Sequence, residues 1–207
     1  NWMTAGRGIV HSERTAPEHR VDGEPLHGLQ FWVGMPTDKE EIDPSFAHLD
    51  GNELPTVSGE GKTARIVAGS LFGQRSPLQT VSETLFADVS LDAGATMPLD
   101  AECEERGIYI VAGELDIAGD KFGAGQLLVF RPTDRITVHA TQPSRIAVIG
   151  GATLDGPRHV WWNFVSSRKE RIEQAKNEWK DGRFQGVPGD EIEFIPLPEN
   201  RPYTAGG

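Results

Sequence analysis

Short runs of Val, Ile, Leu and Phe recur along the chain, separated by glycines and prolines. Apolar and polar positions that alternate over about four to eight residues are typical of half-buried β-strands, and regular turn signals between them favour a sandwich or a barrel. The pattern predicts strands at 8–14, 27–33, 64–70, 83–92, 107–118, 126–131, 135–140 and 144–150. We therefore expect an all-β fold of antiparallel strands.

The strands between residues 83 and 151 follow one another closely, with turn residues at 92–94 and 112–114. This spacing predicts a small antiparallel barrel. The N-terminal strands resemble a second, incomplete copy of it. The stretch between the two sets is acidic and rich in turn residues, and we expect one short helix there, over 40–49.

One long helix is predicted over 168–181. Ser167 and Glu170 have the spacing of a capping box, in which each side chain satisfies a backbone N–H of the first turn. Apolar positions then recur at helical spacing on one face, namely Ile172, Ala175, the stem of Lys176 and Trp179. Gly182 suits the helix end. The remainder, from residue 185, is too rich in Pro and Gly to be helical and is expected to run as an extended tail.

The chain has 31 acidic and 20 basic residues and a formal net charge of −11. A phosphate backbone is bound mainly by clustered Lys and Arg, so direct contact with nucleic acid is not expected. No apolar run approaches the roughly 20 residues of a membrane helix, and the first residues lack the features of a signal peptide. The single cysteine, Cys103, fits a reducing compartment. We expect a cytoplasmic protein without membrane contact.

His11 and Glu13 lie two residues apart, just after the glycine-flanked stretch TAGRGI. Side chains at positions i and i+2 of a strand share one face. An imidazole and a carboxylate on one face suit a divalent metal such as iron, manganese or nickel. The polar face of an ordinary surface strand has the same pattern, so the pair alone leaves both interpretations open.

Three separated segments narrow that choice. WMTAGRGIVHSE at 2–13 resembles the second metal-binding strand of the pirin family, and HGLQFWV at 27–33 resembles the strand that follows it. The segments 161–184 and 187–199 are similar to the closing part of bacterial pirins. The resemblance implies a bicupin, that is, two antiparallel jelly-roll barrels with a C-terminal helix. It places the remainder of the metal-binding barrel at 1–50, a second barrel without metal ligands at 51–165, and the helix and tail at 166–207.

The resemblance also implies a mononuclear metal held by three histidines and one glutamate. His11 and Glu13 match two of these ligands. The other two belong to an H-x-H strand that precedes this motif in the family, so the first barrel is incomplete in this chain. We expect the missing N-terminal segment to be a partner of this chain in the working protein. Iron(II) is the expected metal, with manganese, nickel, copper and zinc as alternatives.

The implied activity is that of a flavonol (quercetin) 2,3-dioxygenase. In that hypothesis Glu13 is also the catalytic base that takes the proton of a substrate hydroxyl. Apolar side chains that could line the mouth for a small flavonoid-like substrate are Trp2, Met3, Phe31 and Trp32, each of which could equally belong to a core. The alternative is a non-enzymatic regulator whose metal redox state tunes contacts with a regulatory protein partner.

Other candidates have plain structural interpretations beside the functional ones. His27 could support the metal site through a hydrogen bond, or could simply be an exposed residue at a strand end. Asp100 and Glu102 stand where the H-x-H of a cupin would fall in the second barrel, and with Glu104 and Glu105 they could attract a hard cation or form a solvated acidic edge. Carboxylates raise the pKa of a neighbouring thiol, which makes Cys103 a poor nucleophile.

Overall fold

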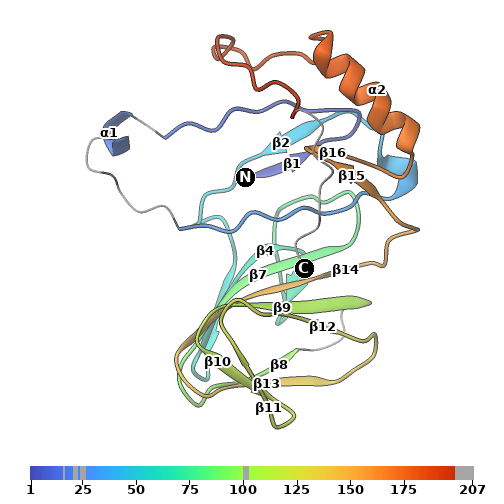
Figure 1. Ribbon diagram of the computed structural model, residues 1–207. Helices are drawn as coiled ribbons and strands as arrows, with labels where there is room; N and C mark the ends of the chain where they lie inside the picture. Colours follow the sequence, from blue (N-terminus) through green and yellow to red (C-terminus); the bar gives the residue numbers. More distant parts are fainter. Residues whose placement is uncertain (16, 21–22, 24–26, 100–102, 199–207) are drawn as a thin grey trace. The chain divides into compact units, whose positions relative to one another are not determined.

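The structure is a computed structural model that describes residues 1–15, 17–20, 23, 27–99 and 103–198 (Figure 1). The chain divides into two compact units, and each is described by itself. Unit 1 comprises Asn1–Trp2 and Ala47–Thr153, and unit 2 comprises Met3–Phe46 and the described residues from Leu154 onward. Among the described residues, no helix combines the length and the apolar character needed to cross a bilayer.

Unit 1 contains two antiparallel sheets. The larger has the strand order β12–β9–β14–β7–β4–β3 and the smaller has the order β11–β10–β13–β8. The strands of the larger sheet are β3 (Thr56–Gly59), β4 (Lys62–Ala68), β7 (Thr84–Leu91), β9 (Glu105–Ala112), β12 (Leu127–Phe130) and β14 (Ser144–Gly151). The strands of the smaller sheet are β8 (Thr96–Leu99), β10 (Glu114–Ile117), β11 (Asp120–Gly123) and β13 (Ile136–Ala140). Separate from both sheets, β5 (Ser70–Leu71) and β6 (Gln74–Arg75) pair as a short hairpin.

The two sheets of unit 1 face each other across one apolar core (Figure 1). Alternate residues of each strand point inward, and these positions carry aliphatic side chains. Both sheets contribute side chains that are fully excluded from water, among them Ile66, Val89, Ile108, Met97, Leu115 and Val138. The small antiparallel barrel predicted within 83–151 is thereby confirmed.

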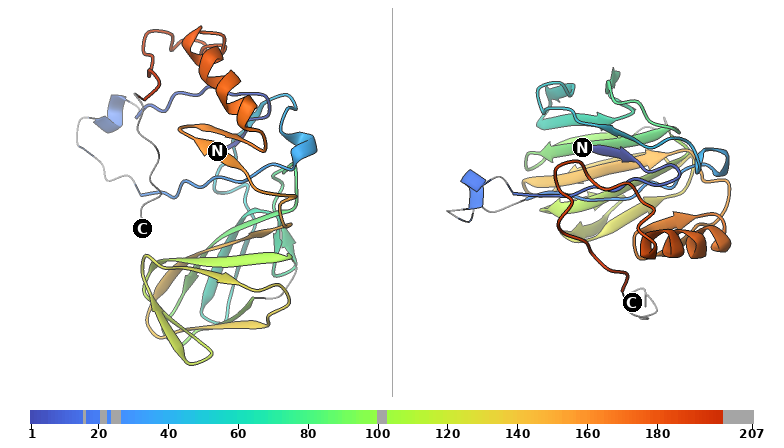
Figure 2. Two further views of the ribbon diagram at one scale, coloured as in Figure 1. Left: turned by 45° about the vertical axis from the view of Figure 1, so that its right-hand side comes forward. Right: turned by 90° about the horizontal axis from the view of Figure 1, so that it is seen from above.

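Unit 2 has little regular structure besides one long helix. Two short two-stranded sheets contain residues of this unit. They are β1 (Trp2–Thr4) with β2 (Ser45–Ala47), of which Trp2 and Ala47 belong to unit 1, and β15 (His159–Trp161) with β16 (Phe164–Ser166). A short helix α1 (Pro17–Arg20) and a 3-10 turn η1 (Thr37–Lys39) lie in its N-terminal part. The long helix α2 (Lys169–Lys180) follows β16, as Figure 2 shows.

A group of rings, which we call the aromatic cluster, joins α2 to the β15–β16 hairpin. It consists of Trp161, Trp162, Phe164, Trp179, Phe184 and Phe194. The centroids of Trp162 and Trp179 are 5.2 Å apart in an edge-to-face arrangement, which is favourable for aromatic pairs. Ile172 and Ala175 are buried on the same side of the helix. The predicted helix and its apolar face are therefore confirmed.

The strands predicted from residue 64 onward are also confirmed, with β4, β7, β12, β13 and β14 close to the expected bounds. The stretch 107–118 is covered by β9 and β10, which meet at the expected turn at Gly113. The non-helical tail is confirmed for residues 185–198, while 199–207 lie outside the described residues. The domain boundaries at 50/51 and 165/166 stay a prediction.

Four local predictions are wrong. Neither 8–14 nor 27–33 belongs to a strand in the described structure, because a strand exists only where a neighbour supplies its hydrogen bonds. No helix covers 40–49, and β2 occupies part of that range instead. The capping box is absent, since the N-cap of α2 is Arg168 and it has no side-chain cap. Ser167 instead donates to the carboxylate of Glu40, a charged and therefore stronger acceptor.

Candidate functional site

His11 and Glu13 lie in a segment of unit 2 that has no regular secondary structure, and both are exposed. A turn directs the chain into this segment: the backbone N–H of Gly8 donates to the carbonyl of Ala5, and that of Arg7 to the carbonyl of Ile42. Gly6 at φ +51° faces the Ile42 carbonyl so closely that a Cβ would lie 2.1 Å from its oxygen. Only glycine fits there, which explains the TAGRG stretch before the candidate ligands.

The C-terminal tail holds Arg14, the residue that follows Glu13. The guanidinium of Arg14 binds Asp190 through two parallel hydrogen bonds, each 2.9 Å long, and donates a third to Glu193 at 2.7 Å. Ser12 and Arg14 together hold the pKa of Asp190 below its ordinary value, because both stabilise the carboxylate. We call this set of four residues the Arg14 clasp.

The sequence around Asp190 accounts for its fixed place. Val187, Pro188, Gly189 and Asp190 form a turn in which the Asp190 N–H donates to the Val187 carbonyl at 3.0 Å. Proline suits the second position of such a turn and Gly189, at φ +81°, the third. The tail beyond it is attached to the aromatic cluster, since Phe194 stacks on Trp179 and the indole N–H of Trp179 donates to the Ile195 carbonyl.

As metal donors, His11 and Glu13 fit in kind but do not complete a site. Imidazole nitrogen and carboxylate oxygen suit a borderline divalent metal. Within the ranges that the structure describes, no group of three or more His, Cys, Asp or Glu side chains could hold a metal ion. The metal assignment of His11 and Glu13 therefore stays a prediction. His27 is exposed, and its supporting role stays a prediction too.

The residues predicted to line a substrate mouth are divided between the two units. Trp2 belongs to unit 1, whereas Met3, Phe31 and Trp32 belong to unit 2 with 37%, 39% and 55% of their surface exposed. A hollow of about 480 Å³ in unit 1 is lined by Pro98, Leu99 and residues 133–137, and it includes none of them.

The acidic candidates of the second barrel are only partly described. Asp100 and Glu102 lie outside the described residues, Glu104 and Glu105 are exposed, and Cys103 is buried. The sequence interpretation missed Arg106, which is only 2% exposed and donates to the carbonyls of Leu99 and Asp134 at 2.9 and 2.7 Å. Its inward place could have been predicted, because it alternates with Ile108 and Ile110 on β9.

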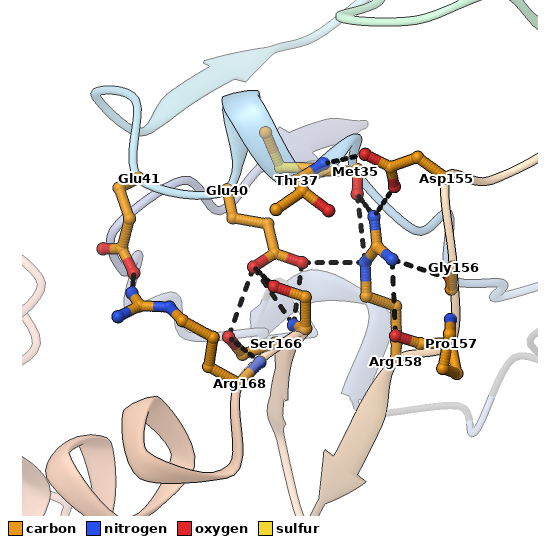
Figure 3. Close-up of polar contacts among 11 residues, drawn as sticks. Met35, Thr37, Glu40, Glu41, Asp155, Gly156, Pro157, Arg158, Ser166 and Arg168 are labelled. Carbon is orange, nitrogen blue, oxygen red and sulfur yellow. Dashed lines mark hydrogen bonds and ion pairs between the residues drawn. The ribbon is translucent and has the colours of Figure 1, made fainter.

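A buried polar network in unit 2 was also missed (Figure 3). Glu40 accepts hydrogen bonds from the backbone N–H and hydroxyl of Ser167 at 2.9 and 2.8 Å, and it is paired with Arg158. Arg158 also donates to the Met35 carbonyl at 2.6 Å and to Asp155 at 2.5 Å. The network joins segments near residues 40, 158 and 167 that are remote in the sequence. No local pattern marks such a contact.

The family models called pirin and pirin C-terminal cupin domain match residues 1–33 and 86–185, respectively. A pirin-like protein of Caulobacter vibrioides is 45% identical over 96% of this chain and 69% of its own length. Human pirin is 31% identical over 88% of this chain and 63% of its own length. A Pseudomonas aeruginosa protein provisionally named quercetin 2,3-dioxygenase is 29% identical over 96% of this chain and 63% of its own length.

Solved structures agree on the fold. A quercetin 2,3-dioxygenase from Acinetobacter baumannii superposes with a TM-score of 0.72 at 22% identity, over 82% of this chain and 57% of that one. A protein from Geobacillus kaustophilus gives 0.67 at 28% identity, over 75% of this chain and 64% of that one. The chain thus spans about two thirds of the length of the curated relatives described above.

Proposed function

The chain belongs to the pirin family, and on this premise we propose that it is the larger part of a metal-dependent oxygenase that acts on flavonols such as quercetin. One observation carries the proposal. His11 and Glu13 lie in the segment that matches the pirin family model, and the clasp holds Arg14, which directly follows Glu13. The names of the Pseudomonas and Acinetobacter proteins support the choice of substrate class.

In this proposal His11 and Glu13 supply two donors, one nitrogen and one oxygen. The remaining donors are assigned to a part of the protein outside the present sequence. A divalent metal bound there would act as a Lewis acid toward an oxygen of the substrate. Glu13 is assigned a second task, to accept the proton of a flavonol hydroxyl, because a carboxylate close to the reacting group can act as a general base.

The proposal is tested with the full-length protein loaded with Fe²⁺. Oxygen uptake is followed after addition of quercetin, and bound iron is measured separately in the same sample. Turnover is expected in the wild type, and His11→Ala should lose both bound iron and turnover. Glu13→Gln should lower kcat more than it lowers iron content, because the amide oxygen can still bind a metal but cannot accept the proton.

A matched control is His139→Ala. His139 lies on β13 of unit 1, within hydrogen-bonding distance of Thr96. Its substitution should change neither the amount of bound iron nor the rate of turnover. Absence of oxygen uptake in a sample with bound iron would reject the oxygenase proposal. That result would favour the regulatory alternative, which itself stays a prediction.

A further inference from the structure

Arg14 directly follows the candidate donor Glu13 and is held by Asp190 and Glu193, although both are remote in the sequence. The segment around it has no regular secondary structure, so these contacts with the C-terminal tail fix its course. Where a chain runs extended, successive side chains point to opposite sides. An Arg14 side chain held on the tail side therefore leaves the other side to Glu13 and, two residues before it, to His11.

We propose that Asp190 and Arg14 are positioning residues for the metal site, because the Arg14 clasp turns His11 and Glu13 toward the metal. This inference rests on the proposed function. The clasp is suited to that task because a guanidinium that grips a carboxylate through two parallel bonds fixes orientation as well as distance. Residues that orient metal ligands typically change metal affinity by about 10- to 100-fold when they are altered.

Both sides of the clasp are attached to the aromatic cluster. On the donor side, Gly8 lies against the ring of Phe184, so closely that a Cβ would be 2.6 Å from Cε1. On the tail side, Phe194 stacks on Trp179 with centroids 5.4 Å apart. The cluster thus serves as a common support for the two segments that the clasp joins, and the C-terminal tail acquires a role in the metal site.

The exposure of the clasp separates this role from a role in stability. The side chains of Arg14 and Asp190 are 44% and 24% exposed. Ion pairs of such exposure contribute little to folding. A large effect of their substitution on metal affinity would therefore report orientation and not loss of the fold.

The test uses the full-length protein, with Fe²⁺ affinity measured anaerobically by competition with a chromogenic chelator. The diagnostic variant is Arg14→Lys, which keeps the charge but loses the two parallel bonds. The control is Arg145→Lys in unit 1, where Arg145 grips Asp88 through two bonds of 2.9 Å and is 46% exposed. Arg14→Lys should weaken Fe²⁺ binding about 10-fold, within the range for residues that orient metal ligands, and Arg145→Lys should leave it unchanged. The melting temperatures of the metal-free variants should be alike.

The outcomes separate this inference from the proposed function. If the wild type binds no Fe²⁺, or His11→Ala binds it as well as the wild type does, the proposed function fails and this inference fails with it. If His11→Ala loses Fe²⁺ while Arg14→Lys keeps wild-type affinity, His11 is a ligand and the clasp has no positioning role. Equal weakening by Arg14→Lys and Arg145→Lys would also overturn the inference.

Discussion

The Nε of Arg158 lies 2.7 Å from Oε1 of Glu40, and the two side chains are only 7% and 10% exposed. This buried ion pair joins the N-terminal part of unit 2 to the segment that leads into β15 (Figure 3). Removal of charges from water is costly, and the hydrogen bonds of Glu40 to Ser167 and of Arg158 to the Met35 carbonyl offset that cost. The pair therefore specifies how these segments meet.

Glu40→Ala should lower the free energy of unfolding by about 3 kcal/mol, because it leaves the Arg158 charge buried without its carboxylate partner. Urea denaturation followed by tryptophan fluorescence measures the loss. The double variant Glu40→Ala/Arg158→Met should recover much of it, since neither charge then remains. The control Asp181→Ala removes an ion pair in which the Arg183 side chain is 68% and the Asp181 side chain 50% exposed. This substitution should lower the free energy of unfolding by less than about 0.5 kcal/mol. Equal losses in Glu40→Ala and Asp181→Ala would contradict the role assigned to the buried pair.

The contribution of Asp155 to the stability of unit 2 depends on pH. Hydrogen bonds from Arg158 and from the Thr37 backbone lower its pKa from 3.8 to about 2. The folded state binds this proton more weakly than the unfolded state, so the stabilisation is present above pH 3.8 and is lost as the pH falls toward 2. Urea denaturation at several pH values should show that Asp155→Asn is less stable than the wild type near pH 5 and that the two converge near pH 2. A difference that is constant across this range would contradict the assignment.

The barrel of unit 1 could be predicted from the sequence because its signals are local. Alternation along β7 and β14 marks the inward face, and a glycine with positive φ stands at the turn between β9 and β10. The segments 8–14 and 27–33 have similar alternation but form no strand in the described structure. Pairing depends on which segments become neighbours, and alternation within one segment does not record that.

Contacts between remote segments were equally unpredictable at the candidate site. The pair His11 and Glu13 stands out in the sequence because a metal needs donors of that kind at that spacing. The partner of Arg14 could not be predicted, since Asp190 is 176 residues away and lies in a tail without periodicity. Ser167 was assigned to a cap for the same reason: the competing acceptor, Glu40, is 127 residues away.

Gly113→Ala should destabilise unit 1 more than Gly119→Ala does. Both glycines have nearly the same backbone angle, with φ of +91° and +92°. A Cβ at 113 would lie 2.2 Å from the Ser144 hydroxyl and 2.6 Å from the Pro143 carbonyl, whereas one at 119 meets nothing within 4 Å. Backbone strain costs about 1–3 kcal/mol at either site, and only residue 113 adds a steric clash. Thermal unfolding of the two variants measures the difference. Equal melting temperatures would show that the neighbours of residue 113 move to accommodate the added Cβ, which would contradict this prediction.

Gly8→Ala tests whether the donor segment really rests on the aromatic cluster. Gly8 has φ of +141°, and an added Cβ would lie 2.6 Å from Cε1 of Phe184. Gly156 is the matched control, because its φ is +143° and a Cβ there meets nothing within 4 Å. We expect Gly8→Ala to destabilise unit 2 by about 1 kcal/mol more than Gly156→Ala does, since only residue 8 combines backbone strain with overpacking.

The double variant Gly8→Ala/Phe184→Leu separates the two costs at residue 8. A leucine at 184 is smaller than the phenylalanine ring and leaves room for the new methyl group, so the interaction energy between the two substitutions should be favourable by about 0.5 kcal/mol or more. Urea denaturation of the four proteins of this cycle gives that energy. If the two substitutions are simply additive, Gly8 does not press on Phe184, and the segment that carries His11 and Glu13 lacks the support described above.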